Sequence, residues 1–461
     1  MDFSTIAAIS TPFGKGGVAV IRISGTEALS IAESIFRSRS GKRVAEQAPR
    51  YQVYGDIVSF SDGARLDDGL LTYFKAPHSF TGEDVVEIAC HGGEVISSLI
   101  LSNILTAGAS MAKAGEFSRR AFVNGKLSLT EAEGVADLLD AKTEEAALLS
   151  AKAVSGALSQ AIGEICDRLT LAASSLWAYL DYPEEDLQGF TDEEILLEFA
   201  EIKAACQKLL NSFRTGKAVY SGLSAVIAGK PNVGKSTFFN ALLGEDRAIV
   251  TAIPGTTRDI IEYPVKMGRV LLNLADTAGL RGETGDRVEE IGMERAIDTI
   301  SDAEVIFALF DLSRELEEDD RKVLSALEKK RDDALVIPIY TKSDQTAVLD
   351  TTPLSFLGEG VSFSAYKEFE TEKIVTRIES AYISDERDWQ EGRILANARQ
   401  KADLSRAMDL LDEISEQIRI GAKDLASLSV ETCLATLLAV DGKEAGEKIL
   451  DQVFSRFCVG K

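Results

Sequence analysis

The chain has 461 residues, enough for about three domains of roughly 150 residues each. Its composition, 45% hydrophobic and 27% charged, is typical of a globular protein. The net charge of -24, from 50 Lys+Arg against 74 Asp+Glu, argues against a nucleic-acid binder, unless a small basic patch lies within the acidic total.

The five cysteines are scattered without a CxxC pair, and there are only two histidines. This pattern argues against a disulfide framework or a zinc site and favours a reducing compartment. The first residues, MDFSTIAAIS, lack the basic segment of a signal peptide, and no apolar run approaches the ~18 residues of a membrane span. We therefore expect a cytoplasmic protein with no membrane partner.

Residues 1–118 have a mixed α+β pattern. Short β-branched runs at 18–25, 51–58, 69–76 and 84–93 are separated by Gly and Pro and predict strands. Residues 94–108 have helical spacing and stop at a glycine, which predicts a helix.

Long helices are predicted from about residue 127, because the sequence becomes rich in Ala, Leu and Glu with a helical period. The segment 181–187 interrupts these helices, and another helix is predicted over 191–214. The composition rich in Ala, Leu and Glu, with its helical period, returns after about residue 385. Between these stretches, buried-strand runs alternate with helical patterns, which predicts a mostly parallel sheet covered by helices. The simplest arrangement is an N-terminal domain (1–118), a helical domain in two parts (119–216 and 383–461) and an inserted α/β domain (217–382).

The inserted domain carries a phosphate-binding motif. GKPNVGKS (229–236) fits GxxxxGK[ST] and lies between a predicted strand, SAVIAG, and a predicted helix, STFFNALLG. Backbone N–H groups and the helix N-terminus would face the phosphates, Lys235 would reach the β- and γ-phosphates, and Ser236 would bind Mg²⁺.

Further nucleotide motifs follow in order. Asp276 to Gly279, DTAG, ends a predicted strand and would contact Mg²⁺ and the γ-phosphate. TKSD (341–344) follows another strand, and the Asp344 carboxylate can accept hydrogen bonds from both guanine donors, which favours GTP over ATP. Thr341 stands where the usual motif NKxD has Asn, so a contact to the base edge or to the phosphate loop is altered. Ser364-Ala365 would support the guanine oxygen through a backbone N–H.

The residues expected to drive hydrolysis differ from those of Ras-like proteins. Thr257, in GTTRD, is the candidate switch threonine that binds Mg²⁺. Leu280 occupies the position where Ras-like proteins place a water-orienting Gln, so hydrolysis should need other groups. Asn232 could hold a monovalent cation near the phosphates, and Glu289 could position water, although an exposed charge at a helix start is the plainer interpretation.

The last predicted helix, EKILDQVFSRF, places Ile449, Leu450, Val453, Phe454 and Phe457 on one stripe. It should therefore dock onto the protein, and the segment Cys458–Lys461 should project from a fixed end.

Taken together, these segments resemble the MnmE (TrmE) family of tRNA-modification GTPases. The resemblance covers nearly the whole chain and rests on GGVAVIRISG (16–25), HSFTGEDVVEIACHGG (78–93), GEFSRRAFVNGKLSLTEAE (115–133), GKPNVGKS with IPGTTRD (253–259), DTAGLR (276–281), VEEIGMERA (288–296) and CVGK (458–461).

The resemblance implies a K⁺-activated GTPase with a Ras-like G domain inserted in an all-helical domain. It implies a homodimer whose N-terminal domains bind 5-formyl- or methylene-tetrahydrofolate and whose G domains associate in the presence of GTP and K⁺. With an FAD-dependent MnmG (GidA)-type partner, the family installs an aminomethyl or carboxymethylaminomethyl group on C5 of the wobble uridine of certain tRNAs. Because this chain is acidic, we expect much of the tRNA surface to come from the partner, with local contributions from Arg119, Arg120, Lys126 and basic positions near 393–401.

The resemblance also implies roles for individual residues. The catalytic candidates are Glu289, Arg258 and Thr256. The nucleotide-binding candidates are Asn232, Val233, Gly234, Lys235, Ser236, Thr237, Thr251, Ile253, Thr256, Thr257, Asp276, Thr277, Ala278, Gly279, Thr341, Lys342, Asp344, Ser364 and Ala365. Mg²⁺ would be bound by Ser236 and Thr257, and K⁺ by Asn232, Thr251, Ile253 and Thr256. The folate candidates are Arg22, Glu87, Lys126 and Lys461. The Cys458 thiol is either a reacting group or a packing residue.

Three other interpretations remain at this stage. The chain could be a regulatory GTPase switch, such as a ribosome-assembly factor, which would share the nucleotide motifs but would not account for Arg22, Glu87 or the CVGK segment. It could be a P-loop ATPase, which Asp344 disfavours. The N-terminal domain could also be a dimerisation module without a ligand.

Overall fold

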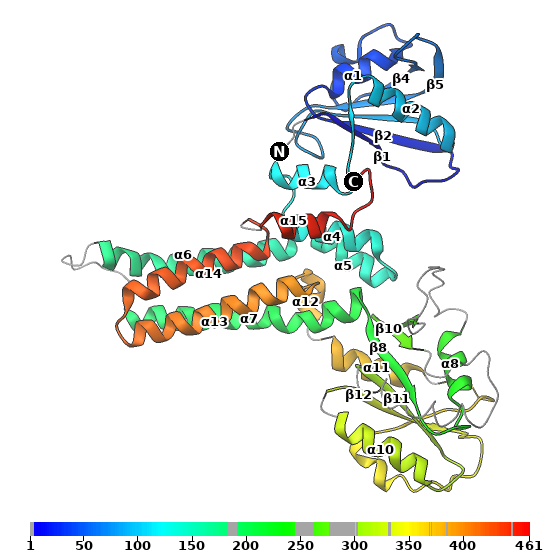
Figure 1. Cartoon of the computed structure of the whole chain (residues 1–461). Coiled ribbons are helices and arrows are strands. Elements are labelled where there is room, and N and C mark those ends of the chain that lie inside the picture. The colour runs from blue at the N-terminus through cyan, green and yellow to red at the C-terminus, as the bar shows by residue number, and fades with distance from the viewer. Residues whose placement is uncertain are drawn as a thin grey trace. The chain divides into compact units, whose positions relative to one another are not determined.

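The computed structural model describes residues 4–181, 191–244, 262–275, 300, 303–330, 333–367, 369, 371–383, 386–443 and 446–461. The helices and strands of the chain are labelled in Figure 1. The chain divides into two compact units. The first unit comprises Met1–Ala136, Val154–Asp167 and Glu431–Lys461, and the second comprises Asp137–Ala153 and Arg168–Val430.

The first unit is built around a seven-stranded sheet with the strand order β3-β4-β5-β6-β2-β1-β7. Its elements are β1 (Ile6–Ile9), β2 (Val18–Ser24), α1 (Ala28–Ile35), β3 (Phe36–Ser38), the short 3₁₀ helix Val44–Glu46, β4 (Gln52–Val58), β5 (Arg65–Phe74), β6 (Val85–His91), α2 (Glu94–Thr106), β7 (Ser110–Met111), α3 (Glu116–Val123) and α15 (Glu447–Phe454). All neighbouring strands pair antiparallel except β1 and β7.

The two faces of this sheet have different surroundings. Alternate residues of each strand, such as Ile21 and Ile88, pack with α1 and α2 in the main core of the unit. The opposite face carries Arg22 and Glu87, with Phe117 of α3 packed against β1 in a smaller cluster. The strands predicted at 18–25, 51–58, 69–76 and 84–93 and the helix at 94–108 are confirmed within a few residues, whereas the shorter β1, β3 and β7 were not predicted.

Four helices have residues in both units: α4 (Leu129–Asp140), α5 (Glu144–Val154), α6 (Ala157–Asp181) and α14 (Lys423–Val440). Within the first unit, α4 and α15 bury Leu129, Phe454 and Phe457 in a common cluster. The docking of the last helix is therefore confirmed, with one correction. Ile449 was placed on the buried stripe but is 36% exposed, because the helix turns its Leu450, Val453 and Phe454 side inward.

The second unit contains a six-stranded sheet with the order β13-β12-β11-β8-β10-β9. Its elements are α7 (Asp192–Tyr220), β8 (Leu223–Ala228), α8 (Lys235–Leu243), β9 (Glu262–Met267), β10 (Val270–Ala275), β11 (Val305–Asp311), α10 (Glu318–Lys330), β12 (Leu335–Thr341), the 3₁₀ helix Thr352–Leu357, β13 (Val361–Ser362), α11 (Thr371–Tyr382), α12 (Glu386–Glu391) and α13 (Ala398–Arg419). The strands pair in parallel except β9 with β10. The mostly parallel sheet expected from the sequence is confirmed.

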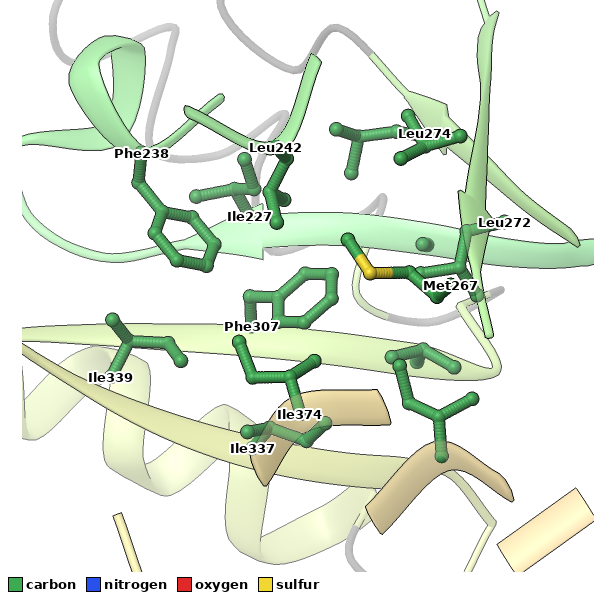
Figure 2. Packing of buried hydrophobic residues seen from close by; sticks show 14 of the residues in the cluster. Ile227, Phe238, Leu242, Met267, Leu272, Leu274, Phe307, Ile337, Ile339 and Ile374 are labelled. Atoms are coloured by element: carbon green, nitrogen blue, oxygen red, sulfur yellow. The ribbon is translucent and has the colours of Figure 1, made fainter. Parts of the chain in front are cut away.

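Apolar clusters cover both faces of this parallel sheet. On one face, Phe238 of α8, Phe307 of β11 and Ile374 of α11 belong to one buried cluster (Figure 2), in which the Phe238 and Phe307 rings lie 5.5 Å apart. On the other face, Phe310 of β11 packs with Leu327 of α10. Burial on both faces explains why these strands read as continuous apolar runs.

The helix α7 begins at a capping box. The Thr191 hydroxyl accepts a hydrogen bond from the Glu194 N–H, and the Glu194 carboxylate accepts one from the Thr191 N–H. At its other end, Thr215 donates to the carbonyl of Tyr382, so the first and last parts of the α/β domain meet beside this helix. No helix among the described residues is long and apolar enough to cross a membrane.

Candidate functional site

The phosphate-binding loop connects β8 to α8 in the second unit. Three of its residues have positive φ angles: Gly229 (156°), Asn232 (59°) and Gly234 (106°). Glycine suits such a conformation because it has no Cβ, and Asn tolerates it better than most residues. The Lys235 ammonium donates to the carbonyl oxygens of Gly229 and Lys230, both at 2.9 Å. The predicted strand–loop–helix context of the motif is thus present.

The side chains expected to meet a nucleotide and its cations lie on the open side of this loop. Asn232, Ser236 and Thr237 are exposed, whereas Val233 is buried in the core. The Ser236 hydroxyl supplies the oxygen ligand that Mg²⁺ prefers, and the Asn232 amide oxygen is a neutral oxygen suited to K⁺. These two residues therefore fit the cations that the sequence implies.

Thr341 links the phosphate-binding loop to the guanine motif. Its hydroxyl lies 2.8 Å from the carbonyl oxygen of Val233 and 3.2 Å from that of Phe310, and the residue is only 2% exposed. A threonine at the usual Asn position therefore still reaches the loop, through its hydroxyl. The contact that the sequence predicts to be altered is therefore made by the shorter threonine side chain, whose hydroxyl reaches the Val233 carbonyl.

The two segments that would hold the base come together at the ends of β12 and β13. The Ser343 N–H donates to the Phe363 carbonyl at 3.1 Å, and the Ser364 hydroxyl donates to Asp344 Oδ1 at 2.7 Å. Asp344 is exposed, and its Oδ2 has no hydrogen-bond partner in the described part of the chain. Its carboxylate is therefore positioned by Ser364 and still accessible to a base, next to Ala365.

Lys342 has a left-handed backbone with φ 58° and pairs with the buried Asp311, at 2.6 Å. Burial alone would raise the pKa of Asp311, but hydrogen bonds from Lys342 and Ser313 lower it below its ordinary value. This ion pair fixes the lysine of the TKSD motif at the end of β11.

A buried lysine inside the phosphate-binding loop was not singled out from the sequence. Lys230 lies 2.7 Å from Asp320 and 3.1 Å from Glu317, near the start of α10. Burial would lower the pKa of Lys230, yet these two carboxylates raise it, so the ammonium stays charged. Lys230 occupies a variable position of the motif and its partners lie some ninety residues later in the chain, so the local pattern gives no signal for it.

Some predicted residues lie outside the described part of the chain. They are Thr251, Ile253, Thr256, Thr257, Arg258, Asp276, Thr277, Ala278, Gly279, Leu280 and Glu289. Their roles stay predictions.

A second candidate site lies on the sheet of the first unit. Arg22 of β2 and Glu87 of β6 are directly opposite each other, and the Arg22 guanidinium makes two contacts with Glu87 Oε1, at 2.9 and 2.8 Å. The Glu87 Oε2 atom has no hydrogen-bond partner in the described part of the chain. The Arg22 guanidinium also lies 5.1 Å from the Phe80 ring and 5.6 Å from the Phe117 ring, a cation–π arrangement.

The last four residues fold back onto this unit. Val459 forms an isolated antiparallel bridge with Ala114, and the Ser10 hydroxyl donates to the Gly460 carbonyl at 3.0 Å. Gly460 has φ 101° and packs so closely on the Ile9 carbonyl that a Cβ would clash with it. The segment Cys458–Lys461 therefore continues from the docked helix and is held beside the end of β1 by backbone and hydroxyl contacts.

This folding brings Lys461 close to Arg22. Burial and, to a smaller extent, the positive charge of Arg22 lower the pKa of the Lys461 ammonium. Cys458 remains exposed, in contrast to the other four cysteines. Lys126 makes a different contact from those of Arg22, Glu87 and Lys461. Its ammonium donates to the carbonyl of Pro77, three residues before Phe80, at 3.1 Å.

Two basic residues proposed as tRNA contacts are engaged elsewhere. Arg120 is largely buried and binds both oxygens of Glu83, at 3.2 and 3.1 Å, and Glu116. Arg119 pairs with Asp451 of α15 at 2.8 Å. Both arginines are therefore held by ion pairs within the first unit, and their contribution to tRNA binding stays a prediction.

These observations define the class of the protein as a P-loop GTPase with an additional α+β domain. A model described as "GTP-binding protein TrmE N-terminus" matches residues 5–126, and one described as "MnmE helical domain" matches residues 129–458. The chain is 40% identical to a "tRNA modification GTPase MnmE" of Symbiobacterium thermophilum, with 100% of both chains covered. It is 38% identical to the protein of that name from Clostridioides difficile, with 99% of both covered, and 37% identical to one from Lactococcus lactis, with 100% and 99% covered. The chain belongs to the MnmE family of tRNA-modification GTPases.

Proposed function

We propose that this GTPase is activated by K⁺ and acts with an FAD-dependent MnmG-type partner on the wobble uridine of certain tRNAs. Using a one-carbon unit of tetrahydrofolate, the pair would install an aminomethyl or carboxymethylaminomethyl group on C5. The observation that carries the proposal is that the chain has two separate polar sites, one built for a nucleotide and one at Arg22, Glu87 and Lys461. A simple GTPase switch gives no reason for the second site.

The nucleotide site supports a preference for guanine. The free Oδ2 of Asp344 and the Oδ1 held by Ser364 face the same open region, so the carboxylate can accept from two adjacent N–H groups of a base. Guanine offers such a pair of donors, and adenine does not. In the presence of triphosphate, Lys235 would exchange its bonds to the Gly229 and Lys230 carbonyls for bonds to phosphate oxygens.

The hydrolysis step needs groups that compensate for Leu280. We infer that K⁺, when bound by Asn232 and by Thr251, Ile253 and Thr256, supplies positive charge beside the phosphates. Mg²⁺ would be bound by Ser236 and Thr257. Glu289 would orient the attacking water, with Arg258 and Thr256 as further catalytic candidates.

The Arg22–Glu87 site supports binding of 5-formyl- or methylene-tetrahydrofolate. The unpaired Oε2 of Glu87 can accept hydrogen bonds from a pterin ring, and the positive charges of Arg22 and Lys461 favour an anionic ligand at this site. Lys126 would assist from the loop that carries Phe80.

The same sheet face supports the proposed homodimer. Val18, Tyr54 and Leu70 are on this face and are 61%, 46% and 37% exposed. A cluster of exposed apolar side chains on an ordered sheet is characteristic of an interaction surface. The net charge of -24 is consistent with a complex in which the partner protein supplies most of the basic surface that binds tRNA.

The test of the cation site is steady-state GTP hydrolysis in matched K⁺ and Na⁺ buffers over a range of protein concentrations. We expect a K⁺-specific gain on the order of tenfold or more, growing with protein concentration. Asn232→Gly removes the amide oxygen but suits the local φ of 59° and should abolish the gain. Asn240→Ala, at an exposed position of α8, should keep it. Equal slow rates in both salts would refute K⁺ activation.

A further inference from the structure

A cationic pocket lies beside the Arg22–Glu87 site in the first unit. The cavity has a volume of about 380 Å³ and is lined by Pro49, Arg50, Lys75, Ala76 and His78. Its basic residues come from the segment before β4 and the loop after β5, which are joined where the Arg50 N–H donates to the Tyr73 carbonyl at 2.7 Å. Two strands of the sheet therefore position these residues.

The pocket carries an excess of positive charge. The Arg50 guanidinium donates to the His78 carbonyl at 3.1 Å, and in the described part of the chain neither Arg50 nor Lys75 forms an ion pair. The nearby Asp84 is already engaged, because its carboxylate accepts from the Tyr73 hydroxyl and from the Ala76 N–H, both at 2.9 Å. In a chain with a net charge of -24, unpaired cations that converge on a cavity indicate an anionic ligand.

The left-handed backbone of Arg50 is consistent with a functional position. Its φ is 68°, a conformation that costs energy in a residue other than glycine. The hydrogen bonds of its N–H group to Tyr73 and of its side chain to His78 hold it there.

One loop joins the pocket to the candidate folate site. The loop from Lys75 to Phe80 has the pocket at one end and the Phe80 ring, 5.1 Å from the Arg22 guanidinium, at the other. Lys126 donates to the carbonyl of Pro77 in the middle of this loop. The five residue steps from Lys75 to Phe80 span at most roughly 18 Å, so one extended ligand can reach both ends.

We propose that the cationic pocket binds the poly-γ-glutamate tail of a reduced folate whose pterin occupies the Arg22–Glu87 site. The inference rests on the proposed folate function and adds the form of the ligand, a chain of several carboxylates. Arg50 and Lys75 pair with successive carboxylates of the tail, and His78 provides a further donor. The ligand is selected by the number of its carboxylates, because each added glutamate brings a further carboxylate to these cations.

The experiment measures the affinity of the full chain for 5-formyltetrahydrofolate with one and with five glutamates, by calorimetry at low and moderate salt. We expect the pentaglutamate to bind about tenfold more tightly, with the difference shrinking as salt rises. The double variant Arg50→Gln/Lys75→Gln should bind both forms with the affinity of the monoglutamate.

A matched control comes from the same unit. Arg37→Gln/Lys42→Gln removes the same charge at another cavity, of about 580 Å³, where Glu33 already pairs with Arg43 at 2.6 Å. This control should keep the preference for the pentaglutamate. If it loses the preference equally, general charge is responsible and the pocket assignment is wrong.

The other outcomes separate this inference from the proposed function. Monoglutamate binding without any gain from the longer tail would overturn the pocket assignment and leave the folate site standing. Failure of both forms to bind would overturn the folate site and the pocket together. If the double variant weakened tRNA binding and left both folate affinities unchanged, the pocket would be an RNA contact and the inference would be wrong.

Discussion

Thr341 shows how a single side chain can replace a motif residue. The sequence reveals that Asn is absent from the guanine motif, but it does not reveal which contact remains. The structure supplies it, since the Thr341 hydroxyl meets the Val233 and Phe310 carbonyls in a buried position. The residue therefore joins the phosphate-binding loop to the base-binding segment.

Thr341→Val should destabilise the protein and weaken GTP binding. The change keeps the shape of the side chain but removes the O–H that donates to the Val233 carbonyl, at a cost of about 1–3 kcal/mol. Denaturant unfolding and titration with a fluorescent GTP analogue would measure both effects. Thr346→Val, at an exposed position of the following loop, should change neither. If Thr341→Val had the same free energy of unfolding and the same GTP affinity as the wild type, the Thr341 hydrogen bond would contribute to neither.

His91 and Asp67 form a pH-sensitive pair at the exposed end of β6. The ring nitrogen Nδ1 of His91 lies 2.7 Å from Asp67, and this hydrogen bond raises the pKa of His91. Burial would raise the pKa of Asp67, but the bonds from His91 lower it. The histidine's contribution to stability is therefore full below its unfolded pKa of about 6.5 and is lost as pH rises through the folded value. The carboxylate's contribution is lost as pH falls through its lowered pKa.

An NMR titration of the imidazole protons can check this directly. The chain has two histidines, so His78→Gln leaves only the His91 signal. Its midpoint should lie above about 6.5 and fall when Asp67 is changed to Asn. A midpoint that did not move in Asp67→Asn would show that the pair has no effect on the titration.

At the scale of elements, the helices and longer strands could be predicted because their periodicity is local. The strands β1, β3 and β7 were missed, since each has four residues or fewer and shows no clear alternation. Predicting the path of the last four residues required knowledge of their distant contacts with Ser10 and Ala114. The same reason applies to the pairing of Arg22 with Glu87, which lie 65 positions apart.

The folded-back segment gives a prediction at this scale. Gly460→Ala places a Cβ against the Ile9 carbonyl at a φ of 101°, so the segment should detach and Lys461 should move away from Arg22. We expect folate affinity to fall by about tenfold or more, with GTP hydrolysis unchanged. Val459→Ala, at a position 51% exposed, is the control and should bind folate normally. Equal folate affinity in both variants would remove Lys461 from the site.

For the whole molecule, the sequence predicts an α/β domain inserted in a helical one, and its boundaries near 217 and 382 stay a prediction. The two phosphate- and base-binding segments could also be predicted, because their motifs are local. The anchoring of Lys230 by Asp320 and of Thr341 by the loop could not, since both depend on tertiary packing.

The insertion can be tested by excision. Replacing residues 221–382 with a short Gly/Ser linker should preserve the helical circular dichroism and leave the folate affinity within about twofold, because the two ends of the insert already meet. GTP binding should disappear completely. Loss of folate binding or aggregation of the excised protein would show that the rest of the chain needs the insert for its own folding.

The junction at Thr215 and Tyr382 also has a mechanical consequence. The chain leaves α7 through Ser221 and Gly222, which has φ 80°, and returns at the end of α11, so both crossings lie close together. Ion pairs brace this junction: Lys217 with Glu304 at 2.7 Å, Arg269 with Glu386 at 2.9 Å and Lys266 with Glu145 at 2.8 Å. Ala218 of α7 also belongs to the buried cluster around Phe238, so any rotation of the nucleotide-binding domain relative to α7 would have to break this packing and these ion pairs.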